Sequence, residues 1–191
     1  ETEKFVKTRI KEKNILNYEI KYPITLIGHT FFDKWNIDSI LGVKVNNLGI
    51  NGSTAKLYLQ NVLNKSNWKW LGDYVIIMFG TNEIIFERNI DNIIFDINKL
   101  IQYIRLFYPK KIFFVNISNV NGRIDRDNNF INQCEKIFST NIIADKIIAT
   151  KNLNDKFGWL NKDYTYDGLH LNEKGYTKLL EIIEGEIRND I

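Results

Sequence analysis

Short apolar runs alternate along the chain with longer segments whose apolar residues recur at helical spacing. An apolar run of four to eight residues is typical of a buried strand, and five segments fit that pattern: Ile24–Ile27, Val43–Val45, Tyr74–Phe79, Lys111–Ile117 and Lys146–Ala149. Apolar residues three or four positions apart predict helices over residues 53–63, 90–107, 128–138 and 172–187.

Strands that alternate with helices favour a parallel sheet joined by right-handed crossovers. The pattern therefore predicts an α/β protein, a three-layer α/β/α sandwich around a five-stranded parallel sheet of the flavodoxin-like type. In such folds the functional groups lie at the carboxyl ends of the strands, so we expect the catalytic or binding residues in the segments that follow each strand.

The first residues differ from the remainder of the chain. Residues 3–17 are rich in Lys and Glu, and Phe5, Ile10 and Ile15 are too widely spaced to form a full apolar stripe. This pattern predicts a mostly exposed helix or a connector.

Composition narrows the class of protein. The 191 residues are enough for one domain with a full core. The net charge of +3 is small and mixed, which does not indicate a nucleic-acid partner, and no apolar run approaches the length of a membrane span. Cys134 is the only cysteine, so we expect no internal disulfide and a reducing, cytoplasmic location. We expect neither a metal nor another cofactor.

Four of the segments that adjoin the predicted strands carry reactive or hydrogen-bonding groups. Thr30 follows the first strand, Gly49 the second and Asn82 the third, and the last strand is followed by a loop with Asp167 and His170. A hydroxyl becomes a nucleophile when a base takes its proton, and an imidazole oriented by a carboxylate is such a base. Backbone and side-chain amides can stabilise the oxyanion that forms in acyl transfer. The sequence thus predicts Thr30, His170 and Asp167 as catalytic residues, and the amides of Thr30, Gly49 and Asn82 as an oxyanion hole.

These four segments, in this order, resemble the blocks of the SGNH (GDSL-type) hydrolases. Longer strings resemble the sialic acid O-acetylesterase domain at the carboxyl end of bacterial CMP-sialic acid synthetases: Ile24–His29, Val45–Ile50, Phe79–Asn82, Gly122–Asn128 and Tyr164–His170. The resemblance implies hydrolysis of O-acetyl esters on sialic acid through an acyl-enzyme. It also implies a synthetase domain before this one, with residues 1–20 as the connector and residues 21–191 as the SGNH-type esterase domain.

Two residues depart from the block that usually reads Gly-Asp-Ser. His29 replaces the aspartate, as in the sialate group, and we expect it to hydrogen-bond locally and hold the nucleophile loop. Thr30 replaces the serine; it keeps the hydroxyl but adds a methyl group that stiffens χ1. Three interpretations stay open: a slow threonine esterase, an inactive relative, or a chain altered to trap its substrate.

Arg123 and Arg126 lie in a loop after the fourth predicted strand, on either side of Asp125. An arginine can bind the carboxylate of sialic acid through two parallel hydrogen bonds, whereas ion pairing with Asp125 is the simpler alternative.

The leading hypothesis is an O-acetylesterase for free or CMP-linked sialic acid. The alternative is a catalytically inactive SGNH-like module that binds acetylated sialosides or mediates assembly of a parent synthetase. Acyl transfer to another hydroxyl is a third, weaker hypothesis. The expected partners are a small O-acetylated sialic acid and the fused synthetase domain, with neither nucleic acid nor membrane; a homo-oligomer stays open.

Overall fold

The computed structural model describes residues 1–191, which form a six-stranded sheet between helical layers. Five strands are parallel, in the order β3-β1-β4-β5-β6, and β2 pairs antiparallel with β3 at one edge. The order of the parallel strands is the flavodoxin-like one, as the sequence predicts. The strands are β1 Ile24–Gly28, β2 Ser39–Ile40, β3 Val43–Asn47, β4 Tyr74–Met78, β5 Lys111–Val115 and β6 Lys146–Ile148.

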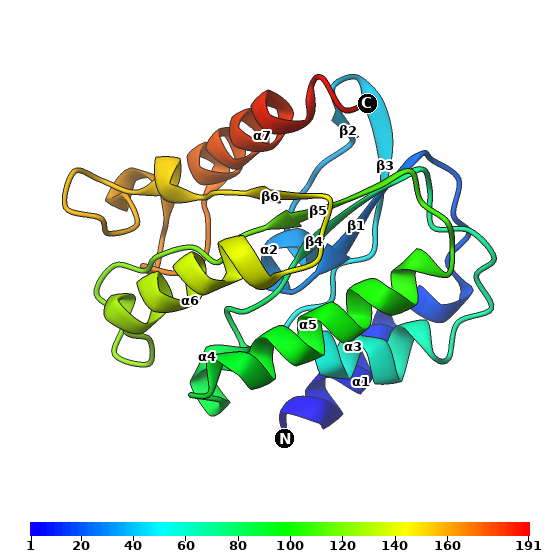
Figure 1. Ribbon diagram of the computed structural model, residues 1–191, viewed down its shortest axis with the longest axis horizontal. Helices are drawn as coiled ribbons and strands as arrows, with labels where there is room; N and C mark the ends of the chain where they lie inside the picture. The colour runs from blue at the N-terminus through cyan, green and yellow to red at the C-terminus, as the bar shows by residue number, and fades with distance from the viewer.

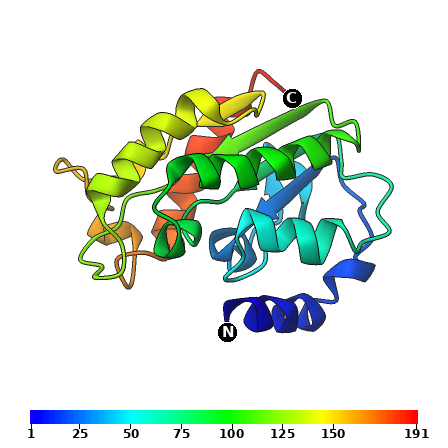
Figure 2. The ribbon, with the colours of Figure 1, turned by 60° about the horizontal axis from the view of Figure 1, so that its bottom comes forward.

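Helices cover both faces of the sheet and confirm the three-layer architecture. In Figures 1 and 2, α3, α5 and α6 lie on one face, whereas α7 lies on the opposite face. None of the helices combines the length and the apolar character needed to cross a membrane. The helices are α1 Thr2–Glu12, α2 Thr30–Asp33, α3 Ala55–Tyr58, α4 Glu83–Phe86, α5 Ile90–Arg105, α6 Asn128–Asn141 and α7 Glu173–Ile187, and a π-helical turn, Leu59–Leu63, extends α3.

The central strands form because they bury nearly all of their side chains. Val75, Ile76, Ile77 and Met78 of β4 are completely buried, and β5 is likewise buried from Ile112 to Val115. A large apolar side chain contributes about 1.5–3 kcal/mol when it is fully removed from water. Continuous apolar runs are therefore stable where helices cover both faces of a parallel sheet.

Three short elements do not follow from the hydrophobic pattern. The helices α2 and α4 have four residues each, and β2 has two. Four residues make about one helical turn, so they show no repeat that a sequence could reveal. The helix α2 begins at Thr30 and α4 begins directly after Asn82, so both start at predicted site residues.

The amino-terminal segment is a helix, and one side of it is buried. Val6, Ile10 and Ile15 have exposed fractions of 0%, 5% and 1% and belong to the same core as the sheet. The sparse apolar residues of α1 are thus sufficient to fix it against the domain, although the opposite side is exposed. That residues 1–20 connect to another domain stays a prediction.

Candidate active site

The first strand delivers Thr30 to the carboxyl edge of the sheet. His29 precedes α2 and caps it, because its Nδ1 accepts a hydrogen bond from the Phe31 N–H over 3.3 Å. The His29 N–H donates to the Met78 carbonyl of β4 at 3.3 Å, which fixes the turn to the sheet. His29 therefore makes local hydrogen bonds that hold the turn around Thr30.

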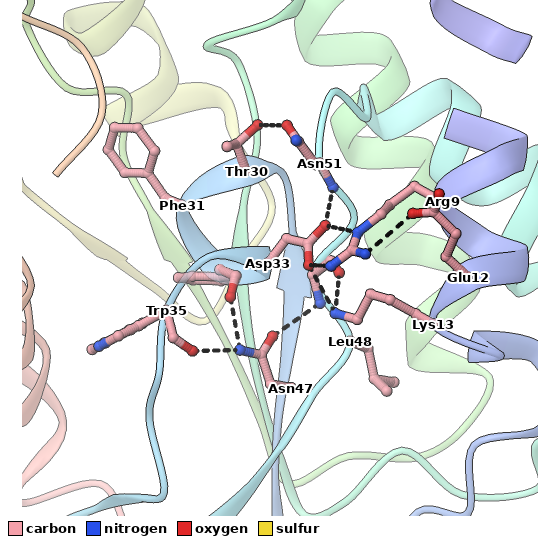
Figure 3. Close-up of polar contacts among 12 residues, drawn as sticks. Arg9, Glu12, Lys13, Thr30, Phe31, Asp33, Trp35, Asn47, Leu48 and Asn51 are labelled. Carbon is pink, nitrogen blue, oxygen red and sulfur yellow. Dashed lines mark hydrogen bonds and ion pairs between the residues drawn. The ribbon is translucent and has the colours of Figure 1, made fainter. Parts of the chain in front are cut away.

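The Thr30 hydroxyl lies against the loop that follows β3. It donates a hydrogen bond to Asn51 Oδ1 at 2.6 Å and accepts one from the Gly52 N–H at 3.2 Å. Figure 3 shows the Thr30 and Asn51 side chains meeting end to end. Gly52 has a φ of +77°, a backbone conformation that suits glycine and aims its N–H at the hydroxyl. The hydroxyl is thus held by two successive residues of one loop.

Asp167 and His170 form a tightly bonded pair in the loop before α7. The Asp167 Oδ2 atom lies 2.6 Å from His170 Nδ1, and Oδ1 accepts the N–H groups of Leu169 at 2.9 Å and His170 at 2.7 Å. Because a carboxylate only accepts, the shared ring proton lies on Nδ1 and leaves Nε2 as a hydrogen-bond acceptor. This arrangement fixes the tautomer that a general base needs.

The environment of Asp167 favours its charged form. Burial opposes ionisation, but the hydrogen bonds from the His170 ring and from the backbone N–H groups of His170 and Leu169 outweigh it and lower the Asp167 pKa to about 2. Tyr166 stacks on the His170 ring, with 5.9 Å between ring centroids and an interplanar angle of 15°. Asp167 is therefore an anion at neutral pH, and the imidazole is held on two sides.

His29, the residue before Thr30, is completely buried. This burial, followed by the charges of Arg126 and His170, lowers the His29 pKa to about 3. The Thr30 hydroxyl donates its only proton in a hydrogen bond to Asn51, and not to His170.

Asn82 faces the same loop from the end of β4. Its Nδ2 donates to the Ser53 carbonyl at 3.0 Å, directly after Gly52. The neighbouring Glu83 is buried and accepts the N–H groups of Ala55 at 2.7 Å and Gly80 at 2.8 Å. Glu83 therefore ties the end of β4 to the start of α3, which keeps Asn82 beside Gly52.

The Gly49 amide, expected to face the nucleophile, makes a different hydrogen bond. The Gly49 N–H donates to Asn47 Oδ1 at 3.1 Å, and its carbonyl accepts the Lys13 ammonium at 2.6 Å. A Cβ at this position would lie 2.4 Å from the Asp33 backbone nitrogen, so glycine is required for packing against α2. The expectation that the Gly49 N–H faces the nucleophile is therefore wrong. The N–H that contacts the Thr30 hydroxyl comes from Gly52.

Gly52 and Asn51 are site residues that the sequence interpretation missed. Asn51-Gly52 is a turn-forming dipeptide, and it lies between the second strand and the next helix. Such a dipeptide indicates a turn, but it does not say which glycine of the loop contacts the nucleophile. Which of two glycines faces the nucleophile depends on how the loop folds over α2, and spacing does not encode that.

Arg123 and Arg126 are both paired with Asp125. Arg123 contacts it with two hydrogen bonds of 2.9 and 3.0 Å, and Arg126 Nη1 lies 2.6 Å from it. Arg123 also lies 3.8 Å from Asp167, and the Arg126 side chain is 4% exposed and donates to the Thr81 carbonyl. The ion pairs that the sequence suggested as the simpler alternative are therefore present, and substrate contact stays a prediction.

Two hollows adjoin the site. One, of about 350 Å³, opens beside Gly52 and Asn82 and has apolar walls from Phe5, Ile85 and Phe86. A larger one, of about 770 Å³, lies between the end of α2 and α7, and its lining includes Tyr166, which stacks on His170. The smaller hollow is lined by Gly52 and Asn82, whose N–H groups are the best placed to donate hydrogen bonds to an oxyanion. It is therefore the better candidate to hold an acyl group.

Comparison with known proteins finds a matching family and a curated relative. Residues 35–178 match the GDSL-like Lipase/Acylhydrolase family, a range that begins just after Thr30 and includes Gly52, Asn82, Asp167 and His170. The N-acylneuraminate cytidylyltransferase of Escherichia coli O18:K1:H7 (strain RS218 / NMEC) is 38% identical over 185 residues, which are 95% of this chain and 43% of that protein. The chain therefore spans less than half the length of this curated relative.

Solved structures show the same fold. A Streptococcus pneumonia protein named for platelet activating factor superposes with a TM-score of 0.82 at 23% identity, covering 97% of this chain and 92% of its own. A GDSL-like lipase from Bacteroides thetaiotaomicron superposes with a TM-score of 0.65 at 18% identity over the full length of both chains. At these identities the likeness concerns the fold alone.

Proposed function

Because the chain belongs to the GDSL-like lipase/acylhydrolase family, we propose that it is an O-acetylesterase that removes acetyl groups from sialic acid. The sialic acid part rests on the 38% identity to an N-acylneuraminate cytidylyltransferase, a protein whose name refers to this sugar. The proposal includes a fusion to a CMP-sialic acid synthetase domain.

In the proposed reaction the Thr30 hydroxyl attacks the acetyl carbonyl while His170 Nε2 takes its proton. Asp167 keeps the ring oriented and stabilises the imidazolium that forms. His170 then returns the proton to the departing sugar oxygen, which leaves acetyl-Thr30. A water molecule, deprotonated by His170, attacks this ester, and acetate departs with the hydroxyl of Thr30 restored.

The oxyanion of each tetrahedral intermediate needs donors near Thr30. We assign the Gly52 N–H, the Asn82 carboxamide and the Thr30 N–H, which begins α2 where helix amides lack intrahelical acceptors. The acetyl methyl would enter the hollow beside Phe5 and Phe86. Gly52 replaces Gly49 in this assignment because the Gly52 N–H contacts the Thr30 hydroxyl, whereas the Gly49 N–H donates to Asn47.

Threonine makes the first step harder. Its hydroxyl must turn from Asn51 toward His170, and the added methyl restricts that rotation. A nucleophile that is misplaced by about 1 Å can lose roughly 100-fold in rate. We therefore propose a slow enzyme that the serine variant would accelerate.

The observation that carries this proposal is the hydrogen-bonded Asp167–His170 pair in a chain whose Thr30 hydroxyl is contacted by a glycine N–H. The test is acetate release from free and CMP-linked O-acetylated sialic acid by the Thr30 chain, Thr30→Ser, Thr30→Ala and His170→Ala. We expect Thr30→Ser to be about 10- to 100-fold faster than the Thr30 chain, and the other two to be inactive. Absence of release from Thr30→Ser would remove the esterase proposal.

A second candidate function is a non-catalytic module that binds acetylated sialosides. The observation in its favour is that the Thr30 hydroxyl is bonded to Asn51 and not to the base. Calorimetry with an O-acetylated sialic acid distinguishes the two. Binding without acetate release from either the Thr30 chain or Thr30→Ser would favour the module, whereas release by Thr30→Ser favours the esterase.

A further inference from the structure

The amino-terminal helix reaches the loop that holds Thr30. One side of α1 is buried through Val6 and Ile10, and its last turn directs Arg9 toward the end of α2. Lys13 follows directly after the helix and points to the same place. Figure 3 shows both cations converging on a single carboxylate, that of Asp33.

Asp33 is a buried anion with an unusually complete set of partners. Its side chain is 1% exposed, and Arg9 contacts both of its oxygens through Nε and Nη2 at 2.8 Å each. The Lys13 ammonium lies 3.2 Å from Oδ1. A bidentate arginine pair is strong and fixes geometry as well as charge. Without this arginine, the buried Asp33 carboxylate would lose two of its hydrogen-bond donors and the nearest positive charge.

Asp33 in turn holds the loop at Asn51. The Asn51 N–H donates to Asp33 Oδ2 at 2.6 Å, while the side chain of the same residue accepts the Thr30 hydroxyl. The loop is held at a second point, because Lys13 donates to the Gly49 carbonyl at 2.6 Å. The contacts thus run without a gap from α1 through Asp33 and Asn51 to Thr30.

We propose that Arg9 is a positioning residue of the esterase site, and that α1 sets the place of Asn51 and Gly52 around Thr30. This inference rests on the proposed function, because it concerns the rate at which Thr30 reacts. A helix that the sequence treats as a connector is then part of the esterase unit. Phe5 of the same helix also lies beside Gly52, where a Cβ would be 3.1 Å from its ring.

The kinetic test compares Arg9→Gln with Lys11→Gln in the full chain carrying Thr30→Ser. Lys11 is an exposed cation of the same helix outside the Asp33 network, so it is a matched control. We expect Arg9→Gln to lower kcat for acetate release on the order of 10-fold, with KM changed less than about twofold, since the nucleophile is displaced but sugar contacts are not. Arg9→Lys should recover part of kcat, because lysine restores the positive charge but not the pair of parallel hydrogen bonds that the guanidinium makes to Asp33.

A second readout does not depend on turnover. In the chain that keeps Thr30, the amide ¹H–¹⁵N resonances of Asn51 and Gly52 should shift in Arg9→Gln and stay in place in Lys11→Gln. Equal kcat and KM in the two variants with unshifted resonances would overturn the proposal. So would a loss of activity that only follows the fraction of folded protein, measured from thermal melting.

If Thr30→Ser releases no acetate in any background, the proposed function has failed, and the resonances alone decide this inference. Shifted Asn51 and Gly52 amides then support the link from α1 to the loop, and unshifted ones contradict it.

Discussion

Individual residues at this site are fixed by contacts that their neighbours in sequence do not reveal. Gly49 and Gly52 lie three positions apart, yet one supports α2 and the other faces the Thr30 hydroxyl. Asp167 has both of its oxygens engaged within four residues of sequence, by the backbone N–H groups of Leu169 and His170 and by the His170 ring. The difference is that the Asp167 contacts are local, whereas the glycine contacts span separate elements.

Asp167→Asn should nearly abolish acetate release. An asparagine can present an N–H to His170 Nδ1 and favour the wrong tautomer, so we expect a loss of about 1,000-fold or more in kcat measured in the Thr30→Ser chain. Asp163→Asn, which changes an exposed carboxylate of the same loop, is the control and should keep full activity. Equal activity of the two variants would contradict the role of Asp167.

Gly49→Ala should destabilise the fold. Its Cβ would lie 2.4 Å from the Asp33 nitrogen and 2.7 Å from the Phe32 carbonyl carbon, both of them backbone atoms. We expect a loss of about 2–4 kcal/mol in the free energy of unfolding, measured with urea. Gly185→Ala on α7 is the control, because no atom lies within 4 Å of its Cβ position and alanine favours a helix, and it should be neutral or slightly stabilising.

At the scale of elements, length decides which ones the sequence reveals. The helix α5 repeats its apolar residues over four turns, and it was predicted for residues 90–107 and observed from Ile90 to Arg105. The four-residue helices α2 and α4 have no such repeat, and they form where loops and strand ends meet. Helix α1 has few apolar residues, but the sheet and its loops offer a surface that buries them.

The buried stripe of α5 supplies a stability test. Ile97 is completely buried, and Ile97→Ala should cost about 2–5 kcal/mol in the free energy of unfolding, since it leaves a cavity under the sheet. Phe95, two residues earlier, is 64% exposed, so Phe95→Ala should change stability by less than about 1 kcal/mol. Urea denaturation of both variants checks the orientation of α5, and equal losses would contradict it.

At the scale of the whole molecule, the parallel sheet brings residues of the candidate site together. Loops from β1, β3 and β4 start at one edge because these strands run in the same direction, and the loop before α7 reaches the end of α2, where the Tyr166 hydroxyl lies 3.5 Å from Lys34 Nζ. The same burial that stabilises the sheet encloses His29, whose pKa falls to about 3. The site and the pH dependence of stability are therefore linked.

Folding stability should fall as the pH decreases from about 6.5 to 3. In that window the unfolded chain binds a proton at His29 whereas the folded protein does not, so His29 contributes a slope of about 1.4 kcal/mol per pH unit. His29→Asn keeps an acceptor for the Phe31 N–H but has no titrating ring. Urea unfolding across this range should give a shallower slope for His29→Asn, and equal slopes would show that His29 is not the group responsible.

The sequence alone determined the alternation of strands and helices, the layers that they form and the Asp167–His170 pair, because these depend on periodicity and on contacts within short stretches of chain. Only the tertiary structure decided that the Gly52 N–H, and not that of Gly49, contacts the Thr30 hydroxyl, that Asn51 accepts a hydrogen bond from this hydroxyl, and that Arg9 of α1 holds Asp33. These contacts join residues 18 to 24 positions apart on separate elements. The packing of one element on another selects such pairs, and no spacing along the chain specifies them.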